Sequence, residues 1–122
     1  MGKHHLRLAH ALPSRVRRPR VPAGIRTRRL ADQGGLRVYL VDGERIRDLI
    51  DTDFTMGGND GRYRYVPRGE VWVEQTLSSR DRATTVLHEV EERRRMVEGG
   101  EDYGRAHDGA LEVERAWRKV NG

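Results

Sequence analysis

Cysteine is absent from this sequence of 122 residues. Its absence excludes disulfides, cysteine-ligated zinc, iron–sulfur clusters and catalysis by a thiol. Small secreted domains usually depend on disulfides, so we expect a cytoplasmic location in a host cell, or a virion. Any metal bound by this chain must therefore be held by imidazole and carboxylate groups.

Long apolar segments are missing as well. No run approaches the ~20 residues that span a bilayer. The start, Met1-Gly2-Lys3, leads into an arginine-rich stretch rather than into the apolar core of a signal peptide. We therefore expect no signal peptide and no membrane contact. The length suits one domain, because domains most often have ~100–150 residues.

Acidic residues are lacking from the first 30 positions. This segment holds nine basic residues, whereas residues 31–122 hold 15 basic and 19 acidic ones. Pro13, Pro19 and Pro22 interrupt any long helix in the segment. The sequence therefore predicts an extended basic arm over residues 1–30 and a domain over residues 31–122.

The arm has two interpretations. Arginine binds phosphate and carboxylate groups bidentately, which favours contact with a protein partner, a neighbouring subunit of an assembly, or nucleic acid. The alternative is a disordered tail that keeps the protein in solution. On the first interpretation, the contact residues are Arg15, Arg17, Arg18, Arg20, Arg26, Arg28 and Arg29.

Short strands are predicted between residues 36 and 75. Residues 36–41 are rich in β-formers and precede Asp42-Gly43, which is typical of a hairpin with residues 45–50 as the second strand. Residues 62–66 alternate arginine and tyrosine, which indicates a strand with its tyrosines inward, or else a stacking surface for single-stranded nucleic acid. Residues 70–74 predict a further strand.

Two helices are predicted to close the chain. Ser78 or Ser79 caps the first, which runs to about Glu98, and Asp102 caps the second, which runs to about Val120. The predicted fold class is α+β, with a small antiparallel sheet of three or four strands covered by these helices. The apolar stripe expected to lie on the sheet consists of Ala83, Val86, Leu87, Val90 and Val97.

Histidines and glutamates recur on both predicted helices. His88 and Glu92 lie one turn apart, which is how one helix offers two ligands to a metal. His107 and Glu114 fall within the apolar face of the second helix, where buried polar groups need compensation. Antiparallel packing across Gly99-Gly100 would bring all four together. The alternatives are a solvated helix face for the first pair and a purely structural buried pair for the second.

This segment resembles the active-site module of the zincin metallopeptidases. In that family a helix carries His-Glu-x-x-His, whose histidines bind zinc and whose glutamate is the general base. This sequence has His88-Glu89-Val90-Glu91-Glu92, with Glu92 at the place of the second histidine. The resemblance covers about residues 70–115. A carboxylate at position 92 would still bind a divalent ion, with more tolerance for manganese or magnesium.

The resemblance implies a role for each candidate residue. The ligands of zinc or another divalent ion would be His88, Glu92 and His107. Glu114 would be a fourth ligand or the acceptor that fixes the tautomer of His107. Glu89 would be the general base for a water molecule whose pKa the ion lowers. Tyr103 would donate a hydrogen bond to a developing oxyanion.

Two classes of function follow from these patterns. The first is a divalent-metal-binding, zincin-like domain that acts as a small metal-dependent hydrolase on peptide bonds. The second is a non-enzymatic virion or assembly protein whose arm binds neighbouring subunits or nucleic acid. The chain from Val38 onward is also similar to short phage or prophage proteins that end in a His-Glu…Ala-His…Glu pattern, a likeness that carries no activity with it.

Overall fold

A computed structural model of the chain describes residues 18–122. The predicted contact residues Arg15 and Arg17 therefore lie outside the described part. The elements follow in the order β1 (Arg26–Arg29), β2 (Arg37–Val41), α2 (Gly43–Leu49), β3 (Gly57–Asn59), β4 (Glu70–Glu74), α3 (Ser79–Arg93), a π-helical turn η1 (Arg94–Glu98) and α4 (Tyr103–Asn121). The predicted α+β class, closed by two C-terminal helices, is confirmed.

The four strands form one mixed sheet in the order β1-β2-β4-β3. β1 and β3 run antiparallel to their neighbours, whereas β2 and β4 run parallel, with Val38 opposite Val71 and Leu40 opposite Val73. The sheet was predicted to be antiparallel, and its two outer strand pairs are, whereas its central pair is parallel. The reason is that the chain crosses from β2 to β4 through α2 and β3 instead of turning back directly.

The predicted hairpin after Asp42 is replaced by helix α2. Asp42 caps this helix, because its Oδ1 accepts a hydrogen bond from the Arg45 amide at 3.1 Å. Ile46, Leu49 and Ile50 are spaced by three and four residues, which is a helical period. Ile46 is fully buried and Ile50 packs against the core, whereas Leu49 is 56% exposed, so burial of Ile46 and Ile50 favours the helix over the strand.

The predicted strand over residues 62–66 is also wrong, because this segment consists of turns. Its tyrosines nevertheless pack inward against the core, as the alternation predicted. The rings of Tyr63 and Tyr65 stack at 5.0 Å. The Tyr65 hydroxyl donates a hydrogen bond to Asp51 at 2.7 Å, so the pair closes one end of the core.

The predicted arm boundary at residue 30 falls after the first strand. Residues 26–29 form β1 and pair with β2, and Ile25 is fully buried. The Arg26 guanidinium forms a bidentate ion pair with buried Glu70, at 3.0 and 2.8 Å. Residues 18–30 are thus held against the domain by a strand, a core side chain and a buried ion pair.

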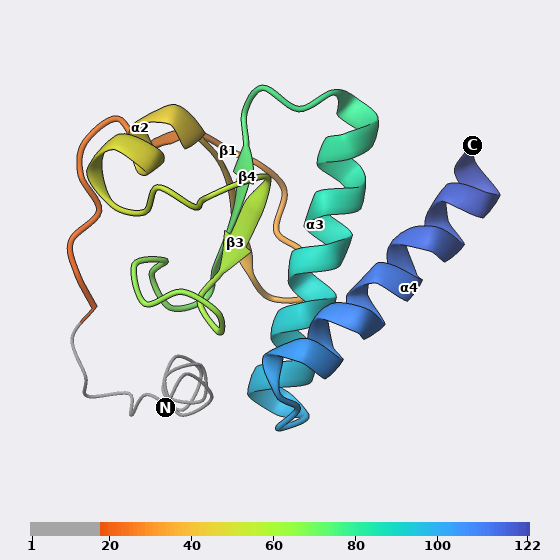
Figure 1. The fold of residues 1–122 in the computed structure, drawn as a ribbon. Coiled ribbons are helices and arrows are strands. Elements are labelled where there is room, and N and C mark those ends of the chain that lie inside the picture. Colours follow the sequence, from red (N-terminus) through yellow and green to blue (C-terminus); the bar gives the residue numbers. More distant parts are fainter. Residues whose placement is uncertain (1–17) are drawn as a thin grey trace.

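The sheet separates two apolar layers. One face packs on α2 through Ile25, Val41, Ile46, Phe54, Val66 and Trp72, and the other faces α3 through Leu36, Val38, Leu40, Val71, Val73 and Val86. Every residue of β4 is buried, because both of its faces are covered. Figure 1 shows α2 and α3 on opposite sides of the sheet, with α4 packed beyond α3.

Helix α3 does not end in regular α-helix. Its last turn widens into η1, where five residues form a π-helical turn. An extra residue in a turn rotates the following side chains. Met96 is consequently 1% exposed and Val97 42% exposed, so Val97 does not continue the apolar stripe predicted for the sheet.

Candidate metal centre

Polar side chains fill the space between α3, the sheet and α4. The Ser78 side chain caps α3 by accepting from the Asp81 amide at 3.1 Å, and the helix then carries Thr84, Thr85, His88, Glu89 and Glu92 into buried positions. His88 is 7% exposed and Glu92 2% exposed. The solvated helix face considered for this pair is therefore not what the structure shows.

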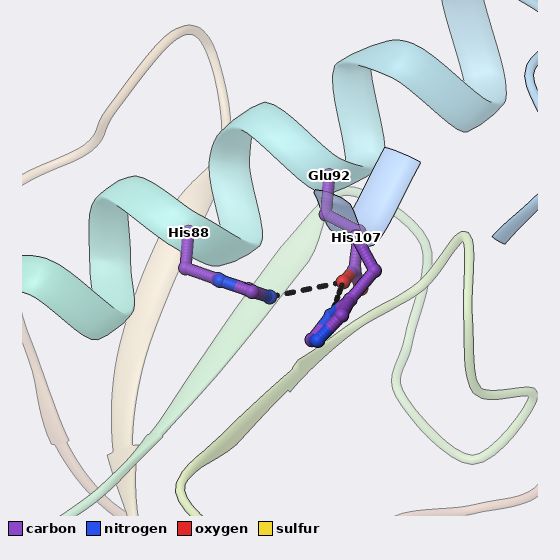
Figure 2. Close-up of side chains that lie close together, drawn as sticks. All are labelled: His88, Glu92 and His107. Atoms are coloured by element: carbon purple, nitrogen blue, oxygen red, sulfur yellow. Dashed lines mark hydrogen bonds and ion pairs between the residues drawn. The ribbon is translucent and has the colours of Figure 1, made fainter. Parts of the chain in front are cut away.

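A single carboxylate oxygen joins the two helices. Glu92 Oε2 accepts a hydrogen bond from His88 Nε2 of its own helix at 3.0 Å and from His107 Nδ1 of α4 at 3.0 Å. Figure 2 shows both imidazoles directed at this carboxylate from different sides. The predicted convergence of His88, Glu92 and His107 across the Gly99-Gly100 connection is present.

Burial and hydrogen bonding shift the pKa values of His88 and Glu92 in opposite directions. Burial alone would lower the pKa of His88, but the hydrogen bond to Glu92 and the nearby carboxylates raise it above its ordinary value. Burial would likewise raise the pKa of Glu92, but hydrogen bonds from His88 and His107 lower it. Both shifts favour a charged pair inside the protein.

Glu89 is the second buried carboxylate of α3. Burial, together with the neighbouring charge of Glu92, raises the pKa of the Glu89 carboxyl to about 8. The amide of Asn59 Nδ2 donates to Glu89 Oε1 at 2.9 Å and to Glu92 Oε1 at 3.1 Å. One amide thus orients both carboxylates.

Asn59 was not predicted from the sequence. It ends β3, and its Oδ1 accepts from the Gly61 and Arg62 amides at 2.9 and 3.1 Å, which fixes the direction of its Nδ2 group. The segment Gly57-Gly58-Asn59-Asp60-Gly61 indicates only a turn. No local signal links Asn59 to a helix 30 residues further along the chain.

Glu114 occupies a different place from the one predicted. Its Oε1 lies 2.9 Å from His88 Nδ1, so it accompanies His88 rather than His107. Among residues 18–122, no group completes a hydrogen bond to His88 Nδ1, because the close Glu114 oxygen lies outside hydrogen-bonding geometry. The hydrogen bond of the His88 ring within these residues is the one through Nε2, and the Glu114 carboxylate lies close to its other nitrogen.

Tyr103 stands beside the third member of the triad. Its hydroxyl lies 3.4 Å from His107 Nδ1, and the two rings stack at 5.3 Å. The guanidinium of Arg62 lies over the Tyr103 ring at 4.2 Å and over the Tyr63 ring at 5.0 Å. Arg62, which the sequence did not single out for this site, thus joins the loop after β3 to the start of α4.

A pocket of about 350 Å³ opens onto these groups. Its lining includes all six residues that the sequence indicated for metal binding or catalysis: His88, Glu89, Glu92, Tyr103, His107 and Glu114. Thr84, Thr85 and Arg118 line it further along the helices. The space beside the triad is therefore large enough for part of a substrate.

The distances between the three candidate ligand atoms can be compared with those around a tetrahedral zinc ion. Zinc bonds to nitrogen and oxygen are ~2.0–2.1 Å, so ligand atoms at tetrahedral angles lie about 3.3 Å apart. One ligand atom each from His88, Glu92 and His107 lies within 4.8 Å of the others, and the two contacts to Glu92 Oε2 are 3.0 Å. Glu114 is not part of this group. The contacts to Glu92 are slightly shorter than this spacing and the widest separation is longer, so a bound ion would require the three side chains to adjust.

None of the helices within residues 18–122 is long and apolar enough to cross a membrane. Compared with protein families, curated proteins and solved structures, the chain matches none of them.

Proposed function

We propose that His88, Glu92 and His107 bind a divalent metal ion and that the chain is a small zincin-like, metal-dependent hydrolase. The observation that carries the proposal is the triad itself, two imidazoles and a carboxylate within 4.8 Å of one another. It lies in a pocket beside a second, hydrogen-bonded glutamate. Three protein ligands beside open space are the usual arrangement of catalytic rather than structural sites.

The donor set bears on which ion is bound. Two imidazole nitrogens and one carboxylate suit zinc, and the carboxylate also makes manganese acceptable. Thiolate ligands are excluded, because the chain has no cysteine. Zinc and manganese are therefore the ions to test first.

The surrounding residues support hydrolytic chemistry. A divalent ion held at the triad would supply Lewis-acid polarisation and lower the pKa of water. Glu89 has a raised pKa and is oriented by Asn59, so it suits the transfer of a proton between water and a leaving group. Tyr103 lines the same pocket and can donate its hydroxyl hydrogen to a developing negative charge.

Metal content provides the first test. Purified full-length protein should hold zinc or manganese in a ratio of about one ion per chain, measured by inductively coupled plasma mass spectrometry. His88→Ala and His107→Ala should lose the ion, whereas His10→Ala, which removes a histidine far along the sequence from the triad, should keep it. Absence of bound metal after incubation of the wild type with either ion would refute the proposal.

Hydrolysis requires a separate test, because metal binding alone does not make an enzyme. Glu89→Gln should retain the ion but lose hydrolysis of a fluorogenic peptide library by ~100-fold or more. Glu98→Gln, a change of the same kind on the exposed end of η1, should retain both. If wild-type protein loaded with metal cleaves no peptide, the proposed hydrolase activity is refuted, whereas the proposed metal binding is not.

A further inference from the structure

A basic groove lies on the side of the domain where the N-terminal segment enters. It has a volume of about 530 Å³ and is widely open to solvent. It shares no lining residue with the pocket at the triad. Its lining consists of Arg18, Pro19, Arg20, Val21, Arg26, Pro67 and Arg68.

Positive charge is concentrated in this groove. Four of its seven lining residues are arginines, and none is acidic. Buried Glu70 lies behind it, where Arg26 at 2.8 Å and Arg37 at 3.6 Å more than neutralise one carboxylate. Arg20 is exposed, and no carboxylate among the described residues pairs with it.

Arg18 shows how closely the cations are crowded. Its Nη1 donates to the backbone carbonyls of Asp60, Tyr63 and Val66, at 2.9, 3.2 and 3.2 Å, so the side chain is anchored in the loop after β3. Its Nε has no hydrogen-bond partner within residues 18–122. Burial and the neighbouring charge of Arg68 lower its pKa. An anionic oxygen in the groove would relieve the repulsion between Arg18 and Arg68.

We propose that this groove binds the phosphodiester backbone of a nucleic acid. The proposal is independent of the metal centre. An open groove cannot enclose a small ligand, so it favours a polymer that runs through it. The groove favours nucleic acid over an acidic protein for two reasons. Nucleic acid has a high charge density, about one phosphate per 3.4 Å of each strand, and the planar guanidinium of arginine matches two phosphate oxygens at once.

Arg20 provides the sharpest variant, because its side chain is exposed and its loss should not unfold the protein. Binding of full-length protein to short fluorescein-labelled oligonucleotides, single-stranded and duplex, would be measured by fluorescence anisotropy over a series of salt concentrations. Arg20→Ala should weaken binding for all sequences and lower the slope of log affinity against log salt by about 1. Arg115→Ala is the matched control, since the Arg115 side chain is 70% exposed on α4 and does not line the groove.

The binding results distinguish the groove from other parts of the protein that could bind an oligonucleotide. Equal effects of Arg20→Ala and Arg115→Ala would overturn the proposal, because binding would then follow net charge and not the groove. Absence of binding at low salt would also overturn it. Poly-glutamate that competes as well as an unlabelled oligonucleotide would instead assign the groove to an acidic protein partner.

Discussion

Gly57 determines how closely strand β3 approaches helix α3. A Cβ at this position would lie 2.8 Å from Thr85 Cγ2 and 2.8 Å from the backbone carbonyl of Trp72. The backbone oxygen cannot move without disturbing β4, which is buried along its whole length. Only glycine therefore lets β3 bring Asn59 within hydrogen-bonding distance of Glu89 and Glu92.

Substitution of Gly57 should accordingly be costly. We expect Gly57→Ala to lower the free energy of unfolding by about 1–3 kcal/mol, measured by urea denaturation. Gly104→Ala is the control, because the nearest atom to its Cβ lies 3.5 Å away, and alanine favours a helix by up to ~1 kcal/mol. Equal stability of Gly57→Ala and wild type would show that β3 has room to move.

The charge on Glu92 should make the stability of metal-free protein depend on pH. The folded pKa of Glu92 is lowered from 4.5, so its contribution is present above that pH and is lost in acid. The folded pKa of His88 is raised from 6.5, so its contribution is present below that pH and is lost as pH rises. The advantage of wild type over Glu92→Gln should therefore be largest between these two values.

Urea denaturation in the presence of a chelator, repeated across pH, measures this difference. We expect about 2 kcal/mol at its maximum, because hydrogen bonds to a buried charge are lost. Glu112→Gln should show no such profile, since its side chain is 77% exposed on α4. If the free energy of unfolding differed between Glu92→Gln and wild type by the same amount at every pH, the Glu92 side chain would stabilise the fold by packing and not by its charge.

The elements that the sequence predicted well are those governed by local signals. Ser78 and Asp102 both cap the helices they were expected to cap, each accepting from an amide three residues on. Helical spacing and a short Gly99-Gly100 connection also suffice to predict that His88, Glu92 and His107 converge. These features depend on neighbours within a few turns, so a single sequence contains the information.

The elements that were missed depend on distant partners. β3 has only three residues, two of them glycine, and it is a strand because it pairs with β4. β1 consists of exposed Arg-Thr-Arg-Arg and pairs with β2 across a bulge. Residues 45–50 have both helical and strand character, and burial of Ile46 decides between them. Glu89 likewise meets Asn59 only through the fold.

Truncation tests where the domain begins. A chain lacking residues 1–17 keeps Ile25, β1 and Arg26, and we expect its thermal unfolding to match that of the full-length protein. A chain lacking residues 1–30 loses a fully buried isoleucine and the Arg26–Glu70 pair. It should be less stable by at least ~2–5 kcal/mol, as followed by circular dichroism. Equal melting of the two truncations would instead support a boundary at residue 30.

Charge divides the molecule into two regions with different chemistry. Arginines gather along the groove beside β1, whereas the buried carboxylates of α3 gather at the triad. Near the groove, Arg26 of β1 and Arg37 of β2 contact Glu70 of β4. Helix α3 covers the other face of the sheet. The two proposed sites therefore have separate residues, and a variant at one leaves the groups of the other in place.

An ion bound at the proposed metal centre should also hold the last two helices together. His88 and Glu92 come from α3 and His107 from α4, so an ion bound by all three ties the helices together in the folded chain only. Binding to the native state alone stabilises it by ~2.7 kcal/mol at an ion concentration 100 times the dissociation constant. Zinc or manganese should thus raise the melting temperature of wild type.

His107→Ala is the decisive variant for this stabilisation. It leaves two ligands one turn apart on α3 and removes the only one of the three that α4 supplies, so most of the shift in melting temperature should disappear. His10→Ala should retain the full shift, measured by differential scanning fluorimetry with and without ion. A shift that persists in His107→Ala and vanishes in His10→Ala would place the ion outside the triad, because stabilisation would then follow a histidine that precedes the described residues.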